Sequence, residues 1–403
     1  LVFAADKIQI SKFVDKPDAV NPVTITFDHQ GRAYIGGVLR RGSGSLDIRR
    51  IPHWVNSDLS FESVEDRQEF YKQAFKEGTS HFKYDFNKDG AKDWKDLMYP
   101  EDPLSSYMDT NGDGKADKIV KIDNKTTTFG AGILAGALWH DGHLYTVQEP
   151  DVWKYSDTNK DGIPDKRQRI STGYSVHIGQ GGHNASGLAI GMDGRLYWSI
   201  ADKGLNAKSP DGKNHIVLPH RGAIMRCELD GSNLEAFALG SRNAQELAFD
   251  KYNNIFSVDN DGDYPTEMER FLYLIEGGET GWRLHWQWFG RQHFTKVSGE
   301  LPYNVWMKEK MSIPYNPDQP AFIVPTLKNY KDGPCGMVYN PGTALSKEFQ
   351  DSFFHSSNND ITSFRVKQKG ASFEMIDEKV IAKGSVLTGM AFSPAGALYA
   401  GSC

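Results

Sequence analysis

Six copies of one short pattern constrain the fold of this 403-residue chain more than any other feature. Each copy is a small or apolar run, a turn and a second apolar run, which is the pattern of a β-hairpin. The copies lie at residues 26–35, 136–145, 187–198, 246–258, 336–339 and 389–399. Hairpins that recur in this way indicate radial repetition, which also protects the edges of the sheets. We therefore predict an all-β chain, a single six-bladed β-propeller over residues 1–403 with four strands in each blade.

The longest interval between two copies contains the clearest helix of the sequence. Apolar residues from Phe61 to Phe75 recur at helical spacing, and Gly78 is a natural end for the helix. We expect the helix to belong to a partly helical insertion over about residues 40–125, between the first and second copies.

Three copies of an acidic loop, Asp-x-Asn-x-Asp-Gly-x-x-Asp, indicate cation binding. Alternate positions supply hard oxygen ligands, and the glycine allows the sharp turn that lets them converge on an ion such as calcium. The predicted ligands are Asp85, Asn87, Asp89 and Asp93 in the first loop, Asp109, Asn111, Asp113 and Asp117 in the second, and Asp157, Asn159, Asp161 and Asp165 in the third. Only the first loop has an acid at its twelfth position, so these are not paired EF-hands. The alternative is three solvated turns.

Composition excludes several classes of protein. The net charge is −6 without a long basic run, which argues against nucleic-acid binding. No apolar stretch approaches the roughly 18 residues of a membrane span. The three cysteines are too few for a disulfide framework, although one bridge is possible. Calcium-type loops without such a framework suit an exported bacterial protein, periplasmic or extracellular. The first residues, LVFAAD, are either the tail of a signal peptide or a chain boundary.

Several phrases near the repeats resemble a known family. GHNASGL at residues 182–188, SIAD at 199–202, SRNAQELAFD at 241–250 and EGGETGW at 276–282 are similar to motifs of the soluble quinoprotein glucose/sorbosone dehydrogenase superfamily. The most similar branch is the planctomycete-type dehydrogenase-like β-propellers, often fused to a cytochrome c domain. The resemblance implies a six-bladed propeller that oxidises a sugar or related alcohol with pyrroloquinoline quinone (PQQ) and calcium.

Oxidising an alcohol requires a base for the hydroxyl proton, and histidine is the natural base near neutral pH. His183 matches the catalytic histidine of the family, and Asp202 matches the carboxylate that orients it. The residues themselves agree, because the two flank one predicted hairpin. The alternative is a structural histidine.

The resemblance also implies a cofactor site. Arg242 and Asn243 match the pair over the quinone, which would make Arg242 both catalytic and cofactor-binding, and Asn260 and Asp261 match the stretch that holds the cofactor's calcium. The acids of this stretch, Asp259, Asp261 and Asp263, suit a hard cation. The alternatives are an arginine in a surface ion pair and a solvated acidic turn.

The chain departs from the family at three cationic positions, which are Asn359, Val386 and Thr388 here. A tricarboxylate such as PQQ needs positive partners, so cations from elsewhere in the chain are required. The candidates considered are Lys203, His220, Arg221, Arg291 and Lys328.

We therefore expect an exported dehydrogenase for a small sugar or alcohol that passes electrons to a haem protein, either a cytochrome c or a fused domain. We expect no nucleic-acid partner and no membrane span. One alternative is a non-enzymatic, calcium-stabilised propeller that binds carbohydrate or protein at the cell surface. A weaker alternative is a calcium-dependent hydrolase similar to a lactonase.

Overall fold

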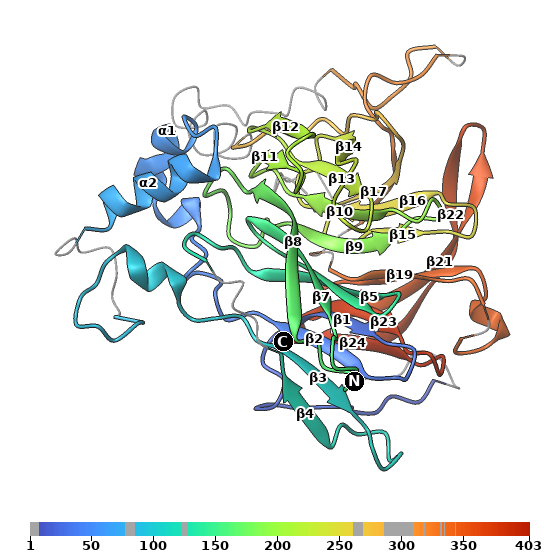
Figure 1. Cartoon of the computed structure of the whole chain (residues 1–403). Helices are drawn as coiled ribbons and strands as arrows, with labels where there is room; N and C mark the ends of the chain where they lie inside the picture. The colour runs from blue at the N-terminus through green and yellow to red at the C-terminus, as the bar shows by residue number, and fades with distance from the viewer. Residues whose placement is uncertain are drawn as a thin grey trace.

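The structure is a computed structural model that describes residues 8–76, 85–122, 128–260, 269–285, 309–316, 319–330, 333, 335–342 and 344–403. Five antiparallel sheets of at least four strands and one two-stranded sheet are arranged around a common centre (Figure 1). The architecture is therefore all-β, with the arrangement of a β-propeller, as the sequence predicted.

The first three sheets, or blades, contain the strands up to residue 239. The first consists of β1 (Pro22–Phe27), β2 (Ala33–Gly37), β3 (Leu104–Met108) and β4 (Lys118–Lys121). The second has β5 (Leu134–His140), β6 (His143–Gln148), β7 (Asp151–Ser156) and β8 (Lys166–Tyr174), and is extended by β11 (Leu205–Lys208) and β12 (His215–Leu218). The third has β9 (Ser186–Ile190), β10 (Leu196–Ile200), β13 (Ala223–Cys227) and β14 (Glu235–Leu239).

The remaining strands form two full blades and a two-stranded sheet. The fourth blade has β15 (Ala248–Phe249), β16 (Ile255–Asp259), β17 (Glu269–Leu274) and β18 (Thr326–Tyr330). The fifth has β19 (Met337–Asn340), β20 (Ser352–Ser356), β21 (Asp360–Lys369) and β22 (Ser372–Lys383). The last pair is β23 (Leu387–Phe392) and β24 (Leu398–Ser402).

Five of the six predicted hairpins are confirmed, since each forms the first two strands of one sheet. The copy at 336–339 covers only β19, whose partner β20 lies beyond the predicted range. The prediction of six four-stranded blades is wrong, because five sheets have four or more strands and β23 pairs only with β24 among the described strands. The repeat pattern locates hairpins, whereas the strands that complete a blade have no shared pattern in this sequence.

The two-stranded sheet closes the ring. Strand β23 lies against β1, and the Thr388 hydroxyl donates to the Pro22 carbonyl at 2.6 Å. A side chain at Gly389 would meet the Val23 carbonyl oxygen, 2.4 Å from the added carbon, so glycine is needed for this approach. The first and last strands are therefore neighbours, as Figure 1 shows for β1, β2, β23 and β24.

An apolar cluster fills each junction between neighbouring sheets. Leu134 and Tyr155 pack with Tyr34 between the first two blades, and Trp198 packs with Tyr145 between the second and third. The other junctions follow the same plan. Because inner strands are covered on both faces, β10 is buried at all five positions and has no polar–apolar alternation.

The helical segment lies between β2 and β3, over residues 38–103. It contains η1 (Ile48–Arg50), η2 (Pro52–Trp54), α1 (Val55–Asp58), α2 (Val64–Ala74) and η3 (Trp94–Met98), and a further turn, η5 (Lys347–Phe349), lies in the fifth blade. Helix α2 begins with a capping box between Ser63 and Asp66. The predicted bounds 40–125 include β3 and β4, which belong to the first blade.

Asp58 fastens this segment to the blades. Its fully buried carboxylate accepts a hydrogen bond from His285 Nε2 at 2.7 Å and from the Ile178 amide at 2.7 Å, while its carbonyl contacts His177 Nδ1 at 2.6 Å. Helix α1 is thereby held against two chain segments that lie far from it in the sequence.

Two further expectations concern cysteines and membranes. Cys227, Cys335 and Cys403 all lie in the described ranges, and all three are unpaired. None of the helices in those ranges is both long and apolar enough to span a bilayer.

Candidate functional site

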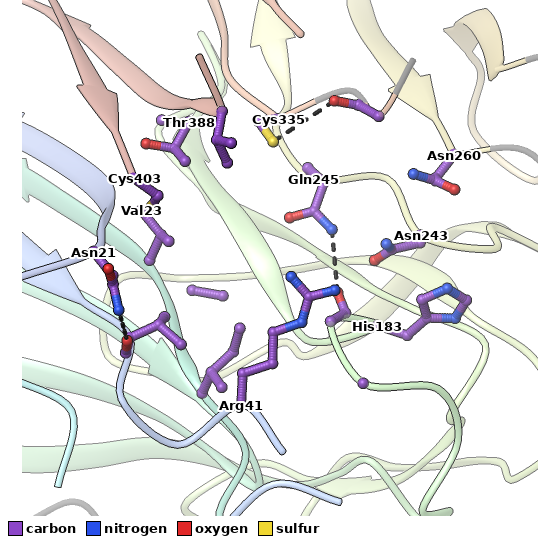
Figure 2. A pocket seen from close by; sticks show the side chains of 18 of the residues that line it. Asn21, Val23, Arg41, His183, Asn243, Gln245, Asn260, Cys335, Thr388 and Cys403 are labelled. Carbon is purple, nitrogen blue, oxygen red and sulfur yellow. Dashed lines mark hydrogen bonds between the residues drawn. The ribbon is translucent and has the colours of Figure 1, made fainter. Parts of the chain in front are cut away.

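A cavity of about 620 Å³ lies where the segments that lead into the innermost strands converge. It is lined by Asn21 beside the first blade, by Arg41 of the helical segment, by Cys335 beside the fifth blade and by Thr388 of the two-stranded sheet (Figure 2). Because every sheet sends its first strand toward the same axis, residues far apart in the sequence meet here. Of the predicted residues, this cavity brings together His183, Arg242, Asn243 and Asn260.

His183 and Asp202 form a buried pair at the cavity wall. His183 precedes β9, Asp202 follows β10, and Nδ1 of the histidine lies 2.7 Å from Oδ1 of the aspartate. The second carboxylate oxygen accepts a hydrogen bond from Trp282 Nε1 at 2.8 Å. The hairpin therefore places the pair as predicted. The sequence placed Trp282 at the end of the EGGETGW motif but assigned it no contact with this pair.

The electrostatics of the pair suit a base. Burial lowers the pKa of His183 below its ordinary 6.5, and the charge of Arg242 acts in the same direction, while Asp202 opposes both. Burial alone would raise the pKa of Asp202, but His183, Arg242 and the Trp282 N–H together outweigh it and hold this pKa below 3.8. At neutral pH the histidine is therefore neutral and the aspartate charged.

The loop before β9 is supported by a second buried ion pair. Lys203 Nζ lies 2.6 Å from Glu149 Oε2, and Glu149 Oε1 accepts from the Ala185 amide at 2.8 Å. Gly182, with φ of 98°, gives the loop a left-handed turn directly before His183. Backbone position and side-chain direction at His183 are thus both determined by neighbours.

Arg242 is held by both its backbone and its side chain. Its guanidinium donates to Asn260 Oδ1 at 2.6 Å and lies over the Trp282 ring, 5.2 Å from the ring centre. Its carbonyl accepts from the Asp202 amide at 2.9 Å, which links it to the His183–Asp202 pair. An arginine held over an aromatic ring at the cavity wall suits contact with a planar ligand.

Asp259 orients the Arg242–Asn243 segment. Its buried carboxylate accepts from the Asn243 amide at 2.7 Å, from the Arg242 amide at 3.1 Å and from Arg270 Nη2 at 2.7 Å. Both oxygens are used in these bonds, and the metal-ligand role of Asp259 stays a prediction. The other two acids of that stretch, Asp261 and Asp263, lie outside the described residues.

Two of the three neutral residues that the sequence places at the cationic positions of the quinoprotein family lie at the cavity. Val386 and Thr388 line it, and Asn358 lines it in place of its neighbour Asn359. The sequence suggested five replacement cations, and none of the four that the structure describes lines the cavity. Lys203 pairs with Glu149, Arg221 with Glu279 and Lys328 with Glu378. His220 packs edge-to-face against His177, and Arg291 lies outside the described residues.

The cavity has cations that the sequence analysis missed, Arg41 and Arg49. Arg49 donates to Asp47, whereas the exposed Arg41 guanidinium has no ion pair with any described residue. Arg40, the residue before Arg41, is buried and donates to four backbone carbonyls, which holds this segment in place. Figure 2 shows Arg41 reaching toward the loop that carries His183. The sequence did not assign either arginine to the cavity, because their position depends on the packing of the helical segment.

The three acidic loops share one conformation. In each, the carboxylate of the first aspartate accepts from the amide of the sixth-position glycine, at 2.6–2.9 Å, and that glycine has φ between 84° and 91°. The ninth aspartate accepts from a threonine in the second and third loops, but caps η3 in the first. Over the described ranges, no group of three or more His, Cys, Asp or Glu side chains is placed to hold a metal. Calcium binding through carboxylate, amide and carbonyl oxygens stays a prediction.

Removing calcium is expected to lower the melting temperature, because a ligand bound only to the folded state stabilises that state. The measurement is a thermal melt in millimolar calcium and in chelator. Asp157→Asn, in the loop whose Gly162 carbonyl accepts from Tyr34 at 3.0 Å, is expected to reduce the difference. Identical melts in calcium and chelator would show that the loops are ordinary turns.

Comparison with known proteins identifies a family and a fold. A family model described as "Domain of unknown function (DUF7133)" matches residues 3–383. No curated protein matches the chain.

Solved structures share the architecture at low identity. A putative oxidoreductase (glucose dehydrogenase) from Thermus thermophilus is 12% identical, with a TM-score of 0.50, 95% of this chain and 91% of that chain being covered. A Trichoderma reesei member of carbohydrate-active enzyme family AA12 is 13% identical, with a TM-score of 0.50 and coverages of 99% and 94%. A PQQ-bound aldose sugar dehydrogenase from Streptomyces coelicolor is 12% identical, with a TM-score of 0.48 and coverages of 93% and 86%. The first two similarities show a common fold.

Proposed function

The chain belongs to the family described as Domain of unknown function (DUF7133), and we propose that it is an oxidoreductase that oxidises a hydroxyl group of a sugar or related alcohol. The observation that carries this proposal is the buried His183–Asp202 pair at the wall of a polar cavity. Fold similarity to sugar dehydrogenases agrees with it.

The pair is arranged to accept a proton. Because Asp202 accepts the hydrogen bond, Nδ1 of His183 carries the proton, and Nε2 keeps a lone pair for the hydroxyl hydrogen of a substrate. Asp202 then stabilises the imidazolium that forms, and Trp282 holds Asp202 in position. A positioned base of this kind contributes about 10²–10⁴-fold to rate.

The lining residues fit an anionic, flat cofactor such as PQQ. Three arginines line the cavity, and the buried Asn243 Oδ1 has no hydrogen-bond partner among the described residues. Arg41 and Arg49 would supply the charge that the family's cationic positions lack, while Arg242, Asn243 and Asn260 would contact the ring system. When bound, such a quinone supplies the two-electron acceptor that alcohol oxidation requires.

Arg41→Gln is expected to weaken PQQ binding about 10- to 100-fold, because a charge-assisted hydrogen bond contributes roughly 1.5–3 kcal/mol. The measurement is a titration of tryptophan fluorescence with PQQ in calcium buffer. Arg50→Gln is a matched control, since Arg50 is exposed and does not line the cavity. Equal affinities for the Arg41 and Arg50 variants would contradict the assignment of Arg41.

The proposal extends to calcium, electron acceptor and compartment. We propose that calcium joins the cofactor near Asn260 and Asp261, and that electrons pass to a haem protein, a cytochrome c or a fused domain. We also propose a periplasmic or extracellular location, where calcium is available to three acidic loops. A visible absorption spectrum of the protein with calcium and PQQ, recorded with and without aldoses, tests the cofactor and its reduction.

A second candidate function is a non-enzymatic propeller that binds carbohydrate or protein at the cell surface. The neutral Val386 and Thr388 at the cavity favour it, because the quinoprotein family that the sequence resembles has cations at these positions. Sugar binding without reduction of added PQQ would support this candidate and exclude the dehydrogenase.

A further inference from the structure

We propose that Glu246 is a ligand-binding residue that selects for an anionic ligand, its carboxylic acid donating a hydrogen bond to a carbonyl or carboxylate oxygen in the cavity. The inference rests on the proposed function only for the identity of that ligand. Neither the motifs nor the family resemblance pointed to a role for Glu246.

The backbone of Glu246 is fixed, which positions the side chain at the cavity wall. Its carbonyl accepts from the buried Ser257 hydroxyl at 2.7 Å. Its Cα lies 3.0 Å from where a side-chain carbon at Gly187 would be, so β9 packs directly against it. Two residues earlier, the Ala244 carbonyl also accepts from the Ser186 hydroxyl, at 3.2 Å.

The Glu246 carboxyl group makes no hydrogen bond or ion pair with any described residue. Every other titratable group that lines the cavity is a cation, a histidine or a thiol: Arg41, Arg49, Arg242, His183, Cys335 and Cys403. Glu246 is therefore the one acid among the described lining residues. An unpaired carboxyl group at the wall of a cavity is available to a ligand.

The environment of Glu246 determines whether its carboxyl group is protonated or ionised. Glu246 is half-buried at the cavity wall, and desolvation of its carboxyl group without a compensating partner raises the pKa to about 8. Burial raises the pKa of Cys335 to about 11, so the neighbouring thiol is neutral as well. At pH 7 the cavity wall thus presents a neutral O–H donor together with three guanidinium groups. Above pH 8 the same residue becomes an anion that repels an anionic ligand.

The first test needs no ligand. When folding raises the pKa of a carboxyl group, the folded protein loses stability as the pH increases from the pKa of the unfolded state, 4.5, to that of the folded state, about 8. Glu246→Gln removes the titration and keeps a similar shape. The melting temperature of Glu246→Gln is expected to rise relative to the natural protein between pH 5 and pH 9. A constant difference between the two over this range would overturn the assignment of a neutral acid.

The second test uses PQQ as the probe at pH 7 and pH 9, with calcium. If only the protonated acid admits the anion, the Kd of the natural protein increases about tenfold between these values. Glu246→Gln is expected to bind PQQ at pH 7, and its Kd is expected to change less than about twofold between pH 7 and pH 9. Glu246→Ala is expected to bind PQQ more weakly at pH 7, also with a Kd that hardly changes with pH. Identical pH profiles for the natural protein and Glu246→Gln would overturn the proposal.

The two tests separate this inference from the proposed function. Absence of PQQ binding at either pH would count against the cofactor, and the melting comparison would still decide the protonation of Glu246. Binding with a pH profile that Glu246→Gln does not alter would leave the cofactor supported and refute the role of Glu246.

Discussion

Replacing His183 by alanine is expected to lower turnover about 10²–10⁴-fold, because the substitution removes the group that accepts the hydroxyl proton. The assay is dye-linked oxidation of aldoses by protein loaded with PQQ and calcium. In the natural protein, activity is expected to fall as pH decreases and His183 becomes protonated, at a pH below 6.5 because burial lowers its pKa.

Two control variants separate chemistry from folding. His183→Gln keeps an amide donor for Asp202 but provides no base, so it is expected to fold like the natural protein and to be as inactive as His183→Ala. His215→Ala removes an exposed histidine on β12 and is expected to retain activity. Turnover within about threefold of the natural protein in His183→Gln would refute the role of His183 as base.

Replacing Asp58 by alanine is expected to lower the free energy of unfolding by about 3–5 kcal/mol, because it removes one partner of a buried, hydrogen-bonded charge network. His285 Nε2 and the Ile178 amide would lose their acceptor in a place that water does not reach. The measurement is the urea midpoint, with circular dichroism as the signal.

A surface aspartate provides the matched comparison. Asp15 pairs with Lys12 at 2.6 Å, and its side chain is 64% exposed, so Asp15→Ala is expected to cost less than about 1 kcal/mol. Equal midpoints for the Asp58 and Asp15 variants would show that the Asp58 network does not hold the helical segment to the blades.

The candidate site was predictable where its parts are near each other in the sequence. His183 and Asp202 flank one hairpin, and a hairpin brings its two ends together whatever surrounds it. Trp282, which donates a hydrogen bond to Asp202, lies 80 residues from it, and no local pattern connects the two. Arg41 and Glu246 were not predicted for a related reason. Whether their side chains are available to a ligand depends on whether residues packed nearby form ion pairs or hydrogen bonds with them.

The acidic loops, like the hairpin, were predictable because their contacts are local in the sequence. Their shared spacing predicted three loops of one kind, and the structure has the same glycine conformation in each, because a short loop is determined by its own hydrogen bonds. Which strands join which blade was not predictable in this way. Strands β11 and β12 join the second blade although they follow β10 of the third, which is a choice between distant partners.

The sequence by itself determined five of the hairpins, helix α2 and the His183–Asp202 pair. Apolar runs on both sides of a turn, apolar residues at helical spacing and the two ends of one hairpin all involve residues close along the chain. The tertiary structure alone decided the number of full blades, the closure of β23 on β1 and the lining of the cavity. It also decided the contact between Asp58 and His285, which are 227 residues apart. Such contacts depend on how whole sheets pack, and the free energy of packing is shared among many side chains that no single motif records.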